Sequence, residues 1–339
     1  MNFLRFSKSF WMLLCLLAMT SGCVQKKQQD PEKILREMIQ ASSNANYTGV
    51  KSFEQRVGNQ FFRFRMKVSH QAPDNTRLEF LEPAPKKGQV VIAHGRESWK
   101  MESPDTSDGS VHFRNVASYH GMEIRNVGLL LQNYEVRYEG TESVANRTAD
   151  VIGIVSGSQP SITRRVWIDH ASRLPLKSEE NANTNGEPRV KRYCYEEIKF
   201  VGRLADTLFS IPMHPGSRSP LPQPRADNIS LEDAKQRAPF LIHAPEYLPK
   251  GFILEQISWL EKTPSGFLHF HYSDGMMALS LFEENAANFQ AAAGNRIYRM
   301  RSGPITVLRR TCNGTHATLV GEVAAEEMVK MMSSLKSCE

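Results

Sequence analysis

The segment Phe62-Arg63-Phe64-Arg65-Met66-Lys67-Val68 decides the fold class. Apolar side chains alternate with basic ones along its whole length, and a period of two places them on opposite faces of a β-strand. A strand with one apolar and one charged face is typical of an antiparallel sheet that is solvated on one side. The same alternation returns in residues 77–81, 89–93, 134–139, 150–156, 165–169, 174–179 and 193–200. We therefore predict one long, curved antiparallel sheet of many strands in this part of the chain.

Two helices are predicted on the concave side of this sheet. Asp30 supplies a capping side chain and Pro31 stands at the first helical position, after which Ile34 and Met38 share one face of the helix. The second helix is predicted within residues 122–132. Side chains that point into such a curved sheet either line a pocket for acyl chains or pack as a dense core. The candidates for a lipid cavity are Phe62, Phe64, Met66, Leu78, Phe80 and Trp99.

A proline-rich stretch divides the chain. Pro220-Leu221-Pro222-Gln223-Pro224 suits a semi-rigid spacer rather than a helix or a central strand. Beyond it, Ser273-Asp274-Gly275 and Asn313-Gly314 each separate two alternating apolar segments, which is a strong signal for a β-hairpin. A helix with acidic residues in its first turn is predicted near the C-terminus. The predicted α+β fold has a large domain at 30–212, a linker at 213–230 and a small α+β domain at 231–339.

The N-terminus predicts export. Arg5 and Lys8 precede ten apolar residues at 10–19, a run too short to span a bilayer, and residues 1–22 are predicted to be a removable signal peptide. Ser21-Gly22-Cys23 is similar to the end of a bacterial lipobox, so Cys23 is a candidate for acylation, followed by a polar tether to residue 29. The alternative is an ordinary signal peptide that is cut nearby. Val24 after the cysteine favours an outer-membrane destination for the anchor.

The charge of the chain disfavours a nucleic-acid partner. Lys and Arg number 42 against 36 Asp and Glu, a net charge of +6, and the loss of Arg5 and Lys8 with residues 1–22 leaves 40 − 36 = +4. These basic residues are dispersed rather than clustered. An acidic protein segment or an anionic lipid headgroup is therefore the more natural partner.

No catalytic motif stands out in the sequence, so we predict neither an enzyme nor a cofactor or metal site. His269 and His271 lie two apart on one face of a predicted strand and have a geometry that can chelate a metal, but no third ligand is near, and ordinary strand residues are the simpler interpretation. Cys312 and Cys338 are candidates for a disulfide in an oxidising compartment, with two free thiols as the alternative.

Several segments resemble the MucB/RseB family. Arg165-Val166-Trp167-Ile168-Asp169, followed by Arg173-Leu174-Pro175-Leu176-Lys177, resembles the family's large domain. Tyr247-Leu248-Pro249-Lys250-Gly251-Phe252 and His271-Tyr272-Ser273-Asp274-Gly275 resemble its small domain. The resemblance covers nearly the whole exported chain, in the expected order.

The resemblance implies a regulator. The large domain is expected to be similar to the lipoprotein carriers of the Lol system, which are half-barrels with an apolar cavity. The partner is expected to be the periplasmic part of a membrane anti-sigma factor. Regulators of this family shield that part from the proteolysis that starts the envelope-stress response. Lipopolysaccharide, lipid or lipoprotein acyl chains are expected to loosen the complex. The candidates for partner contact, taken from the matching segments, are Tyr247, Phe252, Tyr272 and Asp274. The alternative is a lipid or lipoprotein carrier of the cell envelope.

Overall fold

The computed structural model describes residues 29–41, 43–57, 59–94, 97–101, 124, 126–156, 163–184, 187–210, 226–260, 266–288, 296–302 and 305–335. The predicted signal peptide at 1–22, the candidate lipidation site Cys23 and the tether except for its last residue lie outside this description. So do residues 213–225 of the predicted linker. Residues Pro31–Glu339 form one compact unit. No helix in the described part of the chain is long and apolar enough to cross a membrane.

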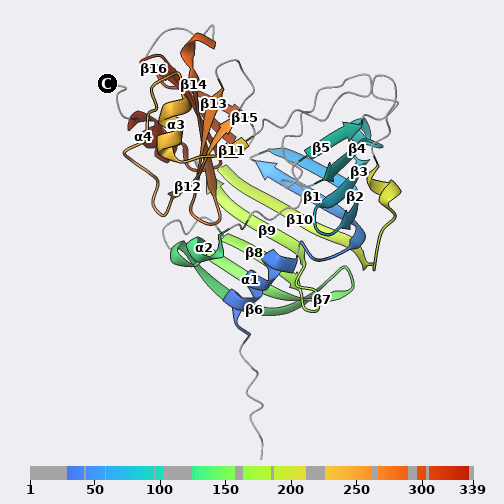
Figure 1. The fold of residues 1–339 in the computed structure, drawn as a ribbon. Helices are drawn as coiled ribbons and strands as arrows, with labels where there is room; N and C mark the ends of the chain where they lie inside the picture. The colour runs from blue at the N-terminus through green and yellow to red at the C-terminus, as the bar shows by residue number, and fades with distance from the viewer. Residues whose placement is uncertain are drawn as a thin grey trace, which may run out of the picture. The chain divides into compact units, whose positions relative to one another are not determined.

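The first sheet is antiparallel and has ten strands in the order β5-β4-β3-β2-β1-β10-β9-β8-β7-β6 (Figure 1). The strands are β1 Tyr47–Val57, β2 Gln60–Gln71, β3 Asn75–Glu82, β4 Val90–His94, β5 Glu97–Met101, β6 Tyr134–Val144, β7 Arg147–Ser156, β8 Thr163–Asp169, β9 Pro175–Thr184 and β10 Glu187–Phe200. Because β5 and β6 are the two edges of the sheet, it is open rather than closed. The predicted half-barrel is confirmed.

Two helices pack on the inner side of this sheet, as the sequence predicted (Figure 1). Helix α1, Pro31–Ala41, buries Ile34, Leu35 and Met38. These side chains share one apolar cluster with residues of β7 and β8. Helix α2, Val127–Asn133, begins later than predicted because the Asn126 side chain caps it, accepting a hydrogen bond from the Leu129 amide at 2.9 Å.

The second sheet is also antiparallel and has seven strands in the order β11-β12-β13-β14-β17-β16-β15. Its strands are β11 Ala226–Asn228, β12 Ile253–Leu260, β13 Phe267–Ser273, β14 Ala278–Asn285, β15 Tyr298–Ser302, β16 Ile305–Cys312 and β17 Thr315–Gly321. Helices α3, Leu231–Arg237, and α4, Ala325–Ser333, contribute buried side chains to the core of this sheet. Short 3₁₀ helices occur at Ala84–Lys86, Asp206–Phe209 and Ala286–Asn288.

The structure differs from the sequence prediction in identifiable places. The turn predicted at Ser273-Asp274-Gly275 extends to Met277, and strand β14 begins at Ala278, because the Asp274 carboxylate accepts hydrogen bonds from the Met276 and Met277 amides. Strand β11 lies inside the predicted linker and pairs with β12. The division into two domains stays a prediction, although each of the two sheets has its own apolar core.

Candidate functional site

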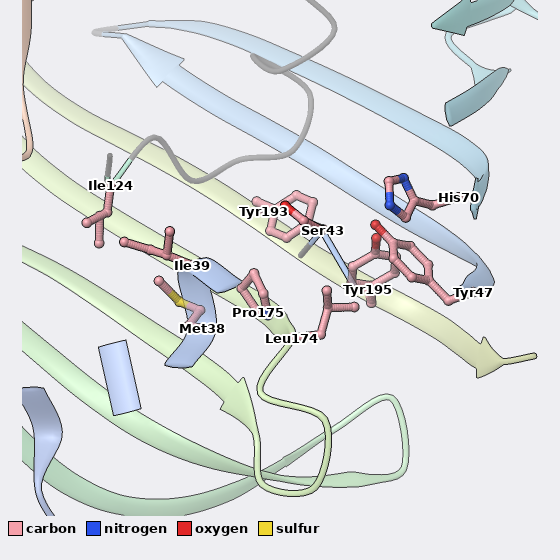
Figure 2. A pocket seen from close by; sticks show the side chains of 10 residues that line it. All are labelled: Met38, Ile39, Ser43, Tyr47, His70, Ile124, Leu174, Pro175, Tyr193 and Tyr195. Atoms are coloured by element: carbon pink, nitrogen blue, oxygen red, sulfur yellow. The ribbon is translucent and has the colours of Figure 1, made fainter. Parts of the chain in front are cut away.

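A cavity of about 220 Å³ lies between α1 and the inner face of the first sheet (Figure 2). Helix α1 and the turn after it contribute Met38, Ile39 and Ser43, and strands β1, β2 and β10 contribute aromatic side chains. The full lining is Met38, Ile39, Ser43, Tyr47, His70, Ile124, Leu174, Pro175, Tyr193 and Tyr195. One side of the cavity is therefore apolar, and the other carries hydroxyl groups and an imidazole.

The aromatic wall is a packed group of rings. Tyr47 stacks on His70 with ring centroids 5.1 Å apart and meets Tyr195 edge-on at 5.9 Å, while Tyr193 meets Tyr195 edge-on at 5.5 Å. Burial raises the pKa of each of these three tyrosines well above the ordinary value for tyrosine, so their hydroxyls stay protonated. The wall therefore offers neutral hydrogen-bonding groups beside apolar ring faces.

A buried lysine lies next to this wall. Lys51 of β1 is 0% exposed, and its Nζ lies 5.3 Å from the centroid of the Tyr193 ring. Burial lowers its pKa to about 7. Near neutral pH, a small change of pH therefore changes the charge of the Lys51 side chain.

Among the six residues predicted for the lipid cavity, the five whose side chains the structure describes do not line it. Met66, Leu78 and Phe80 are 0% exposed and pack in the core of the first sheet, with Phe64 beside them. Phe62 is 41% exposed, and the side chain of Trp99 lies outside the description. The lining residues were missed, although Tyr193 and Tyr195 are two apart in a predicted strand, a spacing that places both on one face. A role for the six in lipid binding stays a prediction.

The loop after β13 packs onto α2. The Tyr134 hydroxyl donates to Asp274 Oδ2 at 2.5 Å, and Asn133 Nδ2 donates to the backbone oxygens of Asp274 at 2.9 Å and Gly251 at 3.0 Å. Gly275 has a φ of +96°, and a Cβ at this position would lie 2.3 Å from the Leu130 amide nitrogen. Only glycine fits this turn, both for its backbone conformation and for its contact with α2.

Charged groups form a second connection between the sheets. Arg189 of β10 donates to Glu180 of β9 at 2.6 Å and to Glu322, just after β17, at 2.7 Å. Arg164 also pairs with Glu180. Burial raises the pKa of Glu180, but the charges of Arg164 and Arg189 outweigh burial and bring it down to about 2. The Glu180 carboxyl is therefore ionised at neutral pH.

The four residues predicted for partner contact have internal structural roles. Phe252 and Tyr272 are 6% and 3% exposed and belong to the core of the second sheet. Asp274, 7% exposed, holds the turn and the Tyr134 hydroxyl. The half-buried Tyr247 donates its hydroxyl to Glu327 of α4. Contact with a partner stays a prediction for all four.

The predicted histidine and cysteine pairs have other environments. His269 stacks on Phe282 with centroids 4.5 Å apart and lies 2.9 Å from Ser280 Oγ, while His271 lies 3.9 Å from Glu255. Burial lowers the pKa of His269 to about 4. Cys312 is disulfide-bonded, and its predicted partner Cys338 lies outside the described residues.

Comparison with known proteins places the chain in a family. The MucB/RseB N-terminal domain profile matches residues 30–207, which is more than half of the 339-residue chain. The chain belongs to the MucB/RseB family. The recognition made from the sequence segments is confirmed. A comparison with curated protein sequences returned no match.

Solved structures of MucB have the fold of this family member. The crystal structure of MucB in complex with MucA(peri) aligns with a TM-score of 0.59 at 20% identity, over 91% of this chain and 99% of that chain. The complex of Pseudomonas aeruginosa MucA/MucB gives 0.59 at 19% over the same shares, and MucB alone gives 0.58 at 18%, over 90% of this chain and 97% of that chain. At these identities the alignments establish a shared fold.

Proposed function

We propose that this protein binds the periplasmic segment of a MucA-like anti-sigma factor and shields that segment from proteolysis. The observation that carries the proposal is membership of the MucB/RseB family, together with the fold shared over 91% of the chain with a MucB that was solved in complex with MucA(peri). The structure supports a binding role by offering a cavity and a connected pair of sheets. The cavity is lined by apolar side chains, by an imidazole and by tyrosine hydroxyls that stay protonated.

The cavity beneath α1 is the proposed lipid sensor. At about 220 Å³ it is smaller than the roughly 300–1,000 Å³ of ordinary ligand pockets, so an acyl chain that enters must widen it by moving α1. Helix α1 shares its apolar cluster with Leu130 of α2 and with Met276, which follows the Asp274 turn. A lipid that moves α1 therefore disturbs the cluster that joins the two sheets. A ligand that binds the free protein better than the complex shifts the population toward release.

The proposed location is the periplasmic face of the cell envelope. The support is the signal-like segment at 1–22 and the lipobox-like Cys23. Acylation of Cys23 would tether the protein, and a tether on the partner's own membrane would raise the effective concentration of the pair. An outer-membrane anchor would work against this gain.

The test uses the protein without residues 1–22 and with Cys23→Ser. Its binding to the purified periplasmic segment of the host's anti-sigma factor is measured by calorimetry, with and without lipopolysaccharide or a diacyl lipid. We expect saturable binding that protects the segment from proteolysis and that weakens when lipid is added. Lack of binding to any anti-sigma segment of the host would refute the regulatory function.

A variant of the cavity mouth tests the sensor separately. Ser43 is exposed at the cavity, so Ser43→Trp should fill the opening without entering a packed core. The matched control is Asn44→Trp, at an exposed neighbour that does not line the cavity. We expect Ser43→Trp to keep anti-sigma binding and to lose its lipid sensitivity, whereas the control keeps both. Equal lipid sensitivity in the two variants would place lipid elsewhere.

A lipid or lipoprotein carrier is the second candidate, and the cavity on the inner face of an open sheet favours it. A carrier takes up acyl chains but has no need for an anti-sigma partner. Lipid uptake that is blocked by Ser43→Trp, in a protein that binds no anti-sigma segment, would favour the carrier over the regulator.

A further inference from the structure

Strand β15 is a free edge of the second sheet. It stands last in the strand order and, among the described strands, pairs only with β16. An edge strand directs part of its backbone N–H and C=O groups away from its neighbour, where a further strand can add to them. Tyr298 and Met300 on this strand are 48% and 54% exposed. The edge therefore offers unpaired backbone together with exposed apolar side chains.

The residues around this edge are strongly basic. Residues 295–312, which contain β15 and β16, include five arginines and no aspartate or glutamate. Arg296, Arg299 and Arg309 are exposed. Within the described part of the chain, Arg296 and Arg299 form no ion pair, in contrast to Arg189, which holds two carboxylates. An exposed cluster of one sign favours a partner of the opposite sign.

The register shows which side chains share a face. Ile297 packs toward the core that α3 and α4 complete, so Tyr298 and Met300 lie on the opposite face of the strand. Tyr298 pairs with Arg309 and Met300 pairs with Val307, and residues paired across antiparallel strands point to the same side. On one face, an added strand would meet Tyr298 and Met300 with Arg309 beside them. On the other face it would meet the guanidinium of Arg299.

We propose that an acidic, extended peptide adds to the free edge of β15 as a further strand, and that this peptide is part of the anti-sigma segment. The inference rests on the proposed function and assigns its binding mode. Acidic side chains of the peptide pair with Arg296 and Arg299, and an apolar side chain packs on Tyr298 and Met300. Charge alone would suit an anionic membrane equally well. The unpaired backbone of the edge favours a peptide, because only a peptide can continue the ladder of hydrogen bonds.

The first measurement is amide hydrogen exchange of the Cys23→Ser protein, alone and with a saturating amount of the anti-sigma segment. Strand addition gives the outward amides of β15 new hydrogen bonds, so exchange at residues 298–302 should slow by about tenfold or more. The same experiment on the segment should show a protected stretch that contains acidic residues. This measurement uses no substitution at the edge, so it does not depend on the folding of a variant.

The second measurement compares two charge-reversal variants. Arg296→Glu/Arg299→Glu changes the edge, and Lys67→Glu/Lys199→Glu changes two exposed lysines of the first sheet by the same total charge. We expect the edge variant to bind the segment about tenfold or more weakly at low salt, with the difference shrinking as salt is added. The control should stay within about twofold of the unsubstituted protein. Met300→Ser, which removes an exposed apolar side chain of the edge without changing its charge, should also weaken binding.

The outcomes separate this inference from the function on which it rests. Binding of the segment without protection of β15, and with unchanged affinity in Arg296→Glu/Arg299→Glu, would overturn strand addition and leave the regulatory function intact. No binding of the segment by the unsubstituted protein would overturn both. Loss of binding to phosphatidylglycerol vesicles in the edge variant, with the affinity for the segment unchanged, would assign the edge to a membrane surface instead. Circular dichroism and thermal unfolding check that each variant is folded.

Discussion

The two sheets each bury an ionisable side chain, and the two side chains respond in opposite directions. Lys51 of β1 and Glu283 of β14 are both 0% exposed. Burial lowers the pKa of Lys51 to about 7 and raises the pKa of Glu283 to about 8. Glu180 is also buried, yet its pKa falls to about 2 because two arginines contact it. At Glu180, contact with two groups of opposite charge therefore outweighs burial and keeps the buried carboxyl ionised.

Lys51→Met should have the largest effect, and only at low pH. The pKa of Lys51 is near 10.5 in the unfolded chain and about 7 in the folded protein, so the free energy of unfolding rises with pH between these values. Below pH 7 the folded protein carries the whole cost of burying the charged ammonium group. Such a pKa difference corresponds to on the order of 5 kcal/mol. The variant should therefore be more stable than the unsubstituted protein at pH 6 and similar to it near pH 10.5, in urea unfolding over a pH series. A gain that is equal at both pH values would mean that packing, not charge, is the cause.

Glu283→Gln should show the opposite pH dependence. The unfolded carboxyl titrates near 4.5 and the folded one near 8, so the free energy of unfolding falls as pH rises between these values. The Glu283 carboxylate accepts a hydrogen bond from the His243 amide at 3.1 Å, and the side-chain oxygen of glutamine can accept it in the variant. The variant should be more stable than the unsubstituted protein at pH 9, by on the order of 4 kcal/mol or less, and similar to it below pH 4.5. The same urea series measures it, and a benefit at pH 4 would contradict the assignment.

A matched pair of core truncations compares the packing of the two sheets. Leu319 of β17 is 0% exposed in the closed core of the second sheet, and Leu174 is 2% exposed but lines the cavity of the first. Leu319→Ala should cost about 3–5 kcal/mol and Leu174→Ala about 2–3 kcal/mol, because a side chain beside an existing cavity has fewer contacts to lose. Chemical unfolding gives both values. Equal costs would indicate that the cavity wall closes around the side chain in solution.

The smallest effect is expected at the contact between the sheets. Tyr134→Phe removes the hydroxyl that donates to Asp274, but leaves the amides of Met276 and Met277 on the other carboxylate oxygen. The loss should be about 1–2 kcal/mol, since one buried acceptor loses a donor. Calorimetry should show whether the two sheets still unfold together. The control within the first sheet is Tyr138→Phe, which removes the hydroxyl that a half-buried tyrosine of the same strand donates to Asp150.

The strands with strict alternation were predictable, and the weaker elements were not. The run from Phe62 to Val68 has a period of two and lies inside β2. Strand β15, Tyr-Arg-Met-Arg-Ser, also alternates, but it has only five residues, so the period of two is too short to identify it. Strand β12 was missed although Ile257, Trp259 and Leu260 are buried, because its first half is exposed. Local pattern identifies strands whose faces differ in polarity along their whole length.

The sequence by itself determined the antiparallel class, the family and the two hairpin turns at Asp274-Gly275 and Asn313-Gly314, because these depend on local periodicity and on short segments. Tertiary structure alone decided the cavity, the contact of Gly275 with α2 and the environments of Lys51 and Glu283. Tyr47, His70 and Tyr195 are far apart in the sequence and meet only when β1, β2 and β10 pair. A cavity and a shifted pKa are properties of such a meeting, because both depend on which atoms of distant strands exclude water from one place.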